Sequence, residues 1–192
     1  MYGRDVKIFG VGLTKTGTTT LHYALRMLGF TSCHSRHVIE PVIEFNLGQG
    51  RRLLWGLADT FDAFVDYPIM LHFEKLDEQY PGSKFIWTVR DKEPWLVSKA
   101  EHIKRFIKDP DERPKHGTPE DWARWYDEHN ARVEKYFGDR DDILKFSICQ
   151  GDGWKKLCTF LGVDEIPVVD FPHAQDRTRP ELLELLDVPL DP

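Results

Sequence analysis

The stretch KIFGVGLTKTGTTTLHYALRMLGF, residues 7–30, has the outline of a phosphate-binding loop between a strand and a helix. An apolar run leads into a turn rich in glycine and threonine, and an amphipathic helical pattern follows. Gly12 and Gly17 have the separation of the Walker pattern G-x-x-x-x-G-K-[ST], and Thr19 fills its last position. Thr18, however, stands where that pattern requires lysine, and Lys15 comes three residues earlier. The stretch therefore predicts an anion-binding loop, but not the usual site for the triphosphate of ATP or GTP.

The rest of the loop chemistry also favours an anion. A glycine-rich turn that leads into a helix presents unpaired backbone N–H groups and the positive end of the helix dipole. Lys15 adds a full positive charge, and hydroxyl donors are available from Thr16, Thr18, Thr19 and Thr20. An ordinary strand–helix turn would also use glycine and a capping threonine, but it does not need this many donors. The dinucleotide fingerprint G-x-G-x-x-G fails, because Lys15 stands where its third glycine belongs.

Hydrophobic patterning extends this unit into a complete α/β architecture. Apolar runs rich in β-formers recur at residues 7–12, 61–67, 84–90 and 143–148, with helical patterns between them. Residues 31–34 are a candidate for one further short strand. Such alternation predicts a three-layer P-loop-type fold, in which helices flank a central, mainly parallel sheet.

Helix-end residues give the pattern its boundaries. The first helix is expected over about residues 18–28, with Gly29 as its C′ residue. Another is expected over about residues 120–137, with Thr118 as N-cap and Pro119 at N1. Residues 108–119 are rich in proline and charge and are expected to form an exposed loop or lid.

Length and composition indicate a single domain over residues 1–192, with a C-terminal tail over about 168–192 packed on it. The net charge of −6 argues against a broad nucleic-acid-binding surface, so an anionic ligand needs a local cluster of cations. No apolar run reaches the roughly 18 residues of a membrane-spanning helix, and the first residues lack the apolar region of a signal peptide. Three cysteines without metal-ligand spacing favour a reducing compartment, and a cytoplasmic location is expected.

The segment TKTGTTTL, residues 14–21, resembles the 5′-phosphosulfate-binding loop of the sulfotransferases that use 3′-phosphoadenosine-5′-phosphosulfate (PAPS). Lys15 matches the lysine that approaches the bridging oxygen and the transferred sulfuryl group in that superfamily. In its cytosolic members the loop has the sequence K-[ST]-G-T-T-W, whereas Thr20 here replaces the tryptophan that packs on adenine. The resemblance implies PAPS as cosubstrate, no metal, and adenine packing from elsewhere in the chain.

A second motif, FIWTVRDKEPWLVS at residues 85–98, ends its strand with Arg90 and has Ser98 eight residues later. A guanidinium group can donate two hydrogen bonds to a phosphate at once, although either residue alone would be read as a surface arginine or a helix serine. In the resembling families, an arginine and a serine at this spacing bind the 3′-phosphate.

Most of the chain resembles a small bacterial and eukaryotic sulfotransferase branch, through residues 64–98, 126–137, 153–162 and 171–177. Some of its members carry the misleading label of NAD-dependent epimerase/dehydratase. The resemblance therefore implies a set of donor-binding residues: Lys15, Thr16, Gly17, Thr18, Thr19, Thr20, Arg90, Ser98 and Arg177. Arg177 is the weakest of these, because the Arg-Lys-Gly segment of cytosolic members is missing.

Sulfuryl transfer to a hydroxyl needs a base near the acceptor. Asp66 is the first candidate, because it follows an apolar run and the carboxyl ends of parallel strands face the ligand crevice. A helix cap and a Mg²⁺ ligand are its alternatives. His34 and then His37 are the next candidates for the base, and each is otherwise a surface or capping residue. His129 is expected to be a packing histidine at least as readily as a functional one.

Three functions are compatible with these motifs. The first is a PAPS-dependent sulfotransferase acting on a small-molecule or carbohydrate acceptor. The second is a P-loop small-molecule or nucleoside kinase with an altered Walker A loop, and the third is a non-catalytic nucleotide-binding protein. Several aromatic residues are candidates for an acceptor pocket, although most are expected in the core: Trp55, Tyr67, Trp95, Trp122, Trp125 and Tyr126. The sequence indicates neither the acceptor nor the oligomeric state.

Overall fold

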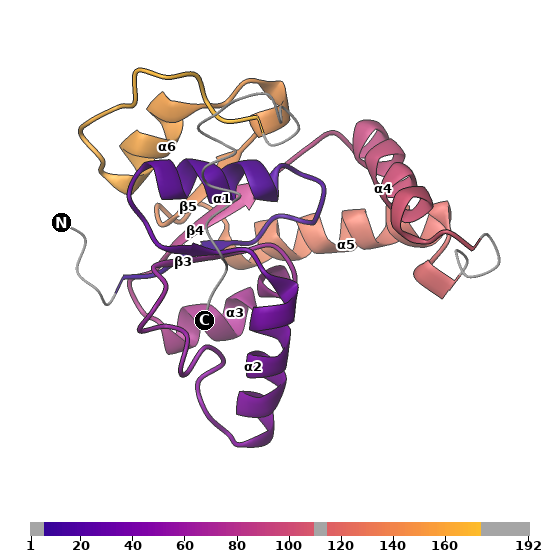
Figure 1. The fold of residues 1–192 in the computed structure, drawn as a ribbon, viewed down its shortest axis with the longest axis horizontal. Coiled ribbons are helices and arrows are strands. Elements are labelled where there is room, and N and C mark those ends of the chain that lie inside the picture. The colour runs from indigo at the N-terminus through magenta and orange to yellow at the C-terminus, as the bar shows by residue number, and fades with distance from the viewer. Residues whose placement is uncertain (1–5, 110–114, 174–192) are drawn as a thin grey trace.

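The computed structural model describes residues 6–109 and 115–173, which form a five-stranded sheet between two layers of helices (Figure 1). The strands, in chain order, are β1 (Ile8–Gly10), β2 (Ser32–Cys33), β3 (Ala63–Val65), β4 (Lys84–Thr88) and β5 (Ile143–Phe146). The helices are α1 (Thr18–Met27), α2 (Arg36–Gly48), η1 (Ile69–Leu71), α3 (Phe73–Gln79), α4 (Lys92–Phe106), α5 (Pro119–Phe137), η3 (Ile148–Gln150) and α6 (Trp154–Leu161). The sheet order is β2-β3-β1-β4-β5, and every pairing is parallel, which confirms the predicted fold class.

The register of the central strands creates one functional edge. Gly10 at the end of β1 lies opposite Val65 of β3 and Ile86 of β4. The chain segments that leave these three strands therefore start at the same edge of the sheet, where ligands of open α/β sheets bind. This edge receives the glycine- and threonine-rich loop, Asp66 and Arg90.

The two faces of the sheet are covered by different helices. Helices α1 and α6 bury the face that contains Ile8, Val65 and Ile86. Helices α2, α3 and α5 bury the opposite face, where the ring of Phe9 lies 5.5 Å from that of Phe85. Every residue of β1 and β3 is buried, so the centre of the sheet is fixed between two apolar layers.

Helix α1 forms where the sequence predicts it. Its leucines at positions 21 and 25 are fully buried in the sheet-facing cluster. Gly29 follows the C-cap residue Leu28 as the predicted C′ residue: its φ of 86° is left-handed, and its N–H donates to the carbonyl oxygen of Arg26. The predicted short strand after it is β2.

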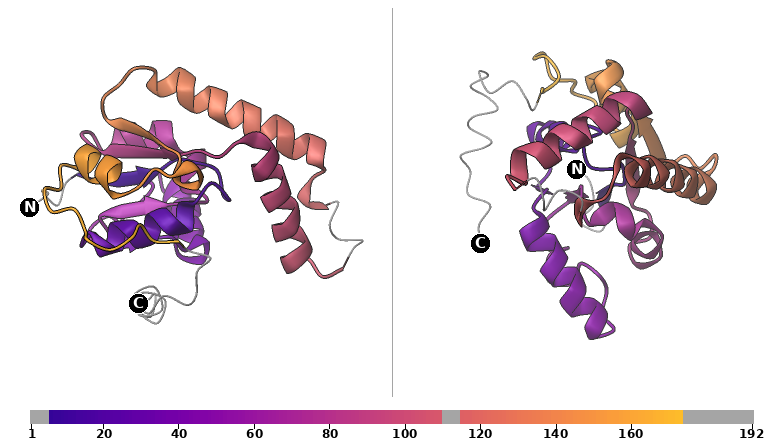
Figure 2. Two further views of the ribbon diagram at one scale, coloured as in Figure 1. Left: turned by 90° about the horizontal axis from the view of Figure 1, so that it is seen from above. Right: turned by 90° about the vertical axis from the view of Figure 1, so that its right-hand side faces the viewer.

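Helices α4 and α5 pack against each other and extend beyond the sheet edge (Figures 1 and 2). The loop of residues 11–17, between β1 and α1, is here named the phosphate loop for its predicted role. It shares a separate apolar cluster with the two helices, formed by Leu13, Trp95, Ile103 and Trp122. The predicted N-terminus of α5 is confirmed, because Thr118 and Asp121 form a capping box and Pro119 opens the helix. We refer to α4 and α5 together as the arm.

The chain between and after these helices is described in part. Lys115 and His116 are exposed, as expected for this loop, whereas residues 110–114 lie outside the described residues. The tail up to residue 173 packs on α6, since the indole N–H of Trp154 donates to the carbonyl oxygen of Val169 at 2.7 Å. Arg177 and the segment ELLELL also lie outside the described residues. In the described part of the chain, no helix combines the length and apolar character that a membrane crossing requires.

Candidate functional site

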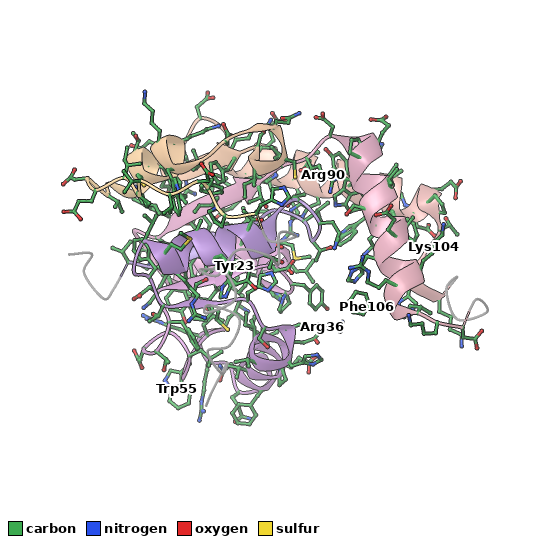
Figure 3. All side chains as sticks on the ribbon, turned by 45° about the horizontal axis from the view of Figure 1, so that its top comes forward. Tyr23, Arg36, Trp55, Arg90, Lys104 and Phe106 are labelled. Atoms are coloured by element: carbon green, nitrogen blue, oxygen red, sulfur yellow. The ribbon has the colours of Figure 1, made fainter. Side chains whose placement is uncertain are left out.

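A pocket of about 710 Å³ lies between the phosphate loop, the ends of β3 and β4, and the arm. Arg36, at the start of α2, and Phe106, at the end of α4, both line it, and both are labelled in Figure 3. The lining residues come from the loop and the first turn of α1 (Thr14, Lys15, Gly17, Thr18, Thr19 and Thr20), from the sheet edge and the start of α2 (His34, Arg36, Asp66, Tyr67 and Arg90), from the arm and the segment between its helices (Ser98, Lys99, His102, Ile103, Phe106, Ile107, His116 and Trp125) and from the last third of the chain (Ile148, Cys149 and His173).

The loop at the head of this pocket is held close to β4. A Cβ at Gly12 would lie 2.3 Å from the carbonyl oxygen of Thr88, so glycine is required for this approach. Gly17 has a φ of 102°, and a Cβ there would meet Ile148 at 3.2 Å. The two glycines therefore allow the loop backbone to pack closely against β4 and Ile148. The loop leads directly into α1, whose first N–H groups have no partner within the helix.

Thr16 differs from the other threonines of the loop. Its hydroxyl is buried, donates to the carbonyl oxygen of Leu13 at 2.6 Å and lies 2.6 Å from the hydroxyl of Thr88. Thr16 therefore fastens the loop to β4 and is not among the pocket-lining residues, in contrast to the expected donor role of its hydroxyl. Thr18, Thr19 and Thr20 do line the pocket.

Lys15 is held in an unusual backbone conformation at the pocket wall. Its φ is 72°, in the left-handed region that costs a non-glycine residue roughly 1–3 kcal/mol. Burial lowers the pKa of its ammonium group, Arg105 and Arg90 lower it further, and Asp66 opposes them. The guanidinium of Arg90 donates to the carbonyl oxygen of Lys15 at 3.4 Å. Two cations of the predicted donor site thus lie side by side.

Two of the three candidate bases meet in the pocket. The Nε2 atom of His34 lies 3.2 Å from Oδ2 of Asp66, and also 3.4 Å from the hydroxyl of Thr19. Asp66 has a φ of 75°, and its Oδ1 atom is buried without a hydrogen-bond partner. His37 is exposed and does not line the pocket. Asp66 and His34 therefore form a pair that neither position alone would indicate.

Behind this pair lies a third histidine that the sequence did not single out. His22 of α1 is buried, its ring centroid is 5.5 Å from that of His34, and its Nδ1 is 2.9 Å from the hydroxyl of Ser32. Burial, followed by the neighbouring His34 and Arg26, lowers the pKa of His22 to about 3. A neutral ring thus supports His34 from the side of α1.

The arm is tied to the phosphate loop by hydrogen bonds. The indole N–H of Trp95 donates to the carbonyl oxygen of Thr14 at 2.8 Å, and the Tyr126 hydroxyl donates to that of Arg90 at 2.6 Å. Arg90 and Ser98, predicted from their spacing, both line the pocket. His129 instead packs within the fold, with Nε2 2.8 Å from the carbonyl oxygen of Val11.

Other pocket residues were missed from the sequence. Lys99 and His102 follow Ser98 on α4, and helical spacing places His102 one turn beyond it. That spacing was the available signal. Of the predicted aromatic candidates, Tyr67 and Trp125 line the pocket, whereas Trp95 is core and Trp55 is exposed elsewhere. No three His, Cys, Asp or Glu side chains of the described residues are grouped as metal ligands would be.

Comparisons with known proteins identify the family. A family model described as a sulfotransferase domain matches residues 7–116 and 110–179. A relative from Aspergillus versicolor, Ava biosynthesis cluster protein M, is 24% identical over an alignment of 213 residues with gaps, which covers 88% of this chain and 80% of the relative. The crystal structure of a sulfotransferase from Alicyclobacillus acidocaldarius matches with a TM-score of 0.58 and 17% identity over 94% of this chain and 89% of that one, and this likeness shows the fold. Because the family model covers most of its length, this chain belongs to the sulfotransferase domain family of transferase enzymes.

Proposed function

We propose that this sulfotransferase takes its sulfuryl group from PAPS and transfers it to a hydroxyl of a small-molecule or carbohydrate acceptor, with release of 3′,5′-adenosine bisphosphate (PAP). The observation that carries the proposal is the meeting of Lys15 and the loop with the Asp66–His34 pair in one pocket. An anion site and a proton acceptor are the two elements that sulfuryl transfer to a hydroxyl requires.

The donor half of the pocket has the donors that PAPS needs. The N–H groups at the start of α1, the Thr18, Thr19 and Thr20 hydroxyls and Lys15 hold the 5′-phosphosulfate. Arg90 and Ser98 hold the 3′-phosphate, and Gly17 lines the pocket beside the loop threonines. PAPS supplies an activated sulfuryl group, which carries less charge than a γ-phosphoryl group and is stabilised by lysine and backbone donors without Mg²⁺.

The chemistry follows from the two sides of this site. The acceptor oxygen forms a bond to sulfur while the bond between sulfur and the 5′-phosphate oxygen breaks. The acceptor proton passes to the Asp66–His34 pair, and Lys15 stabilises the negative charge that develops on the departing phosphate oxygen. The kinase alternative is less well supported, because Thr18 replaces the Walker lysine and Asp66, its proposed Mg²⁺ ligand, is paired with His34.

A thermal-shift titration tests the donor. PAP without Mg²⁺ is expected to stabilise the protein by about 2.7 kcal/mol at a hundred times its Kd, and AMP much less, because it lacks the 3′-phosphate. Stabilisation by Mg·ATP alone would instead support a kinase. PAP binding without sulfuryl transfer to any hydroxyl, phenol or amine would support the non-catalytic alternative.

Two variants sharpen this test. Arg90→Ala should weaken PAP binding by about ten- to a hundredfold, the loss of a charge-assisted contact, and leave AMP binding nearly unchanged. Lys15→Ala should lower kcat by about 10²- to 10³-fold, the effect of removing one donor to a developing charge. Unchanged binding and turnover in both variants would refute the site assignment.

A further inference from the structure

The pocket is larger than its donor half and has a second, differently charged part. Beyond the loop, it is lined on the sheet side by Asp66, Tyr67 and Arg36 and on the arm side by Lys99, His102 and Phe106. Because the proposed donor contacts all lie at the loop, Arg90 and Ser98, this second part is left for the acceptor. We call it the acceptor half.

Charge in the acceptor half is unevenly compensated. Arg36 forms an ion pair with Glu40 at 2.7 Å, and the carboxylate of Asp66 is paired with His34. Lys99, in contrast, forms no ion pair with any residue of the described ranges 6–109 and 115–173, and Asp66 is the one acidic residue among the described lining residues. A partly buried ammonium group therefore faces the pocket without a carboxylate of its own.

Lys99 is also held in place by aromatic packing. Its ammonium lies 5.3 Å from the centre of the Trp125 ring, and that ring packs edge-on against Trp95, with 6.1 Å between centroids. Trp95 is itself hydrogen-bonded to the loop at Thr14. The position of the Lys99 charge is thus set relative to the phosphate loop through a chain of rigid rings, which lowers the entropy lost when an anion binds.

His102 adds an imidazole, a hydrogen-bond donor, to the same wall three residues further along α4. Burial lowers the pKa of Lys99 and of His102, and in both cases the neighbouring Lys15 lowers it further while Asp66 raises it. A neutral acceptor would leave the Lys99 ammonium poorly solvated and close to a like charge. An anionic group on the acceptor would relieve both costs with charge-assisted hydrogen bonds.

We propose that Lys99 and His102 select acceptors that carry an anionic group, such as a carboxylate, in addition to the hydroxyl that receives the sulfuryl group. This inference rests on the proposed sulfotransferase function of the same pocket and adds the chemical class of the acceptor. Lys99 is then a specificity-determining residue on the acceptor side, and it does not act on the donor.

Matched acceptors test the inference directly. Hydroxyphenylacetate, hydroxybenzoate and glucuronate, each beside its uncharged amide, are titrated into the PAP-saturated protein by calorimetry, and initial rates are measured with PAPS. The carboxylates are expected to bind about tenfold or more tightly than their amides, the effect of one charge-assisted hydrogen bond. Lys99→Gln should remove this preference, and His102→Gln should reduce it, while PAP affinity stays unchanged.

Lys104→Gln is the matched control, because it removes the same charge from the same helix, at an exposed residue that is not among those lining the pocket (Figure 3). This control should retain the preference for carboxylates. Equal binding of carboxylates and amides by the wild-type protein would overturn the inference. So would a Lys99→Gln variant that loses PAP affinity, or one that loses rate equally with charged and uncharged acceptors, because Lys99 would then act on the donor or on the sulfuryl group. Failure of PAP itself to bind the wild-type protein would instead refute the proposed donor.

Discussion

At the scale of single residues, Asp66 and Lys15 are the two described non-glycine residues with a positive φ, and both line the pocket. Backbone strain of this kind persists only where the surrounding structure enforces it, and it is concentrated at functional sites. Here, the strained positions are a cation of the loop and the carboxylate that raises the pKa of that cation. The two strained residues are therefore the proposed donor-binding cation, Lys15, and the proposed base, Asp66, and they interact electrostatically.

The Asp66–His34 pair makes the first prediction. Asp66→Asn and His34→Gln should each lower kcat by about 10²- to 10⁴-fold, the usual contribution of general base catalysis, with PAP affinity unchanged. Because the two groups are 3.2 Å apart, the double variant should lose little more than the more damaging single variant. Steady-state kinetics of the three variants measures this, and strictly additive losses would show that the two residues act independently.

His22 makes a prediction about pH. Its pKa is lowered from its usual value near 6.5 to about 3 in the folded protein. At a pH between these two values, His22 is therefore protonated in the unfolded chain but neutral in the folded protein. The free energy of unfolding should therefore fall as the pH falls from about 6.5 towards 3, by up to about 1.4 kcal/mol for each pH unit from this residue. Urea unfolding of the wild type and of His22→Gln at several pH values checks this. Equal pH slopes for the two proteins would contradict it.

At the scale of elements, the arm depends on its helix ends and on its own small core. The capping box of Thr118 and Asp121 begins α5 immediately after the partly described loop, and the aromatic core around Trp95 joins α4 to α5. The arm carries Ser98, Lys99 and His102, so its stability controls one side of the pocket wall. The cluster around Trp95 is thus separate from the sheet core, which the C-terminal part of α5 joins through Val133 and Phe137.

Thr118 tests the contribution of the cap. Thr118→Ala should lower the free energy of unfolding by about 1 kcal/mol, because the hydroxyl that accepts from the Asp121 N–H is lost. Thr118→Ser keeps the hydroxyl and should stay close to the wild type. Urea unfolding compares the three proteins, and equal stability of the alanine and serine variants would show that the cap contributes nothing.

At the scale of the whole molecule, local and overall charge have opposite signs. The chain has a net charge of −6, but the described pocket lining contains Lys15, Arg36, Arg90 and Lys99 against the single acid Asp66. The pocket is formed where three strand ends and the arm converge, so cations far apart in the sequence add their potentials there. A low-dielectric pocket lined by one sign of charge attracts ligands of the opposite sign.

This contrast predicts how salt acts. PAP affinity should fall several-fold as KCl is raised from about 50 to about 300 mM, because salt screens the attraction between the pocket cations and the phosphates. The less highly charged AMP should show a weaker dependence, and so should PAP binding to Arg90→Ala. Calorimetric titration at each salt concentration measures this. An affinity that rises with salt would mean that the net negative charge of the protein dominates.

Much of the fold could be read from the sequence because its determinants are local. Strand and helix periods predicted the layers, and Gly29, Thr118 and Pro119 marked helix ends that the structure confirms. The eight-residue spacing of Arg90 and Ser98 also sufficed to bring both to one pocket, since Arg90 comes two residues after the end of β4 and Ser98 lies about two turns into the helix that follows.

Tertiary structure decided what depends on contacts between distant segments. The sequence alone determined the α/β fold and predicted an anion-binding loop, because hydrophobic period and glycine spacing act within a few residues. It did not distinguish Thr16, which bonds Thr88, from the pocket-lining threonines, and it did not pair His34 with Asp66. It also did not predict Lys99 as a site residue. A lysine on a helix becomes a candidate for ligand binding only when an aromatic ring from another helix positions its charge and no carboxylate is paired with it. These properties arise from the packing of strand ends against the arm, which no local pattern encodes.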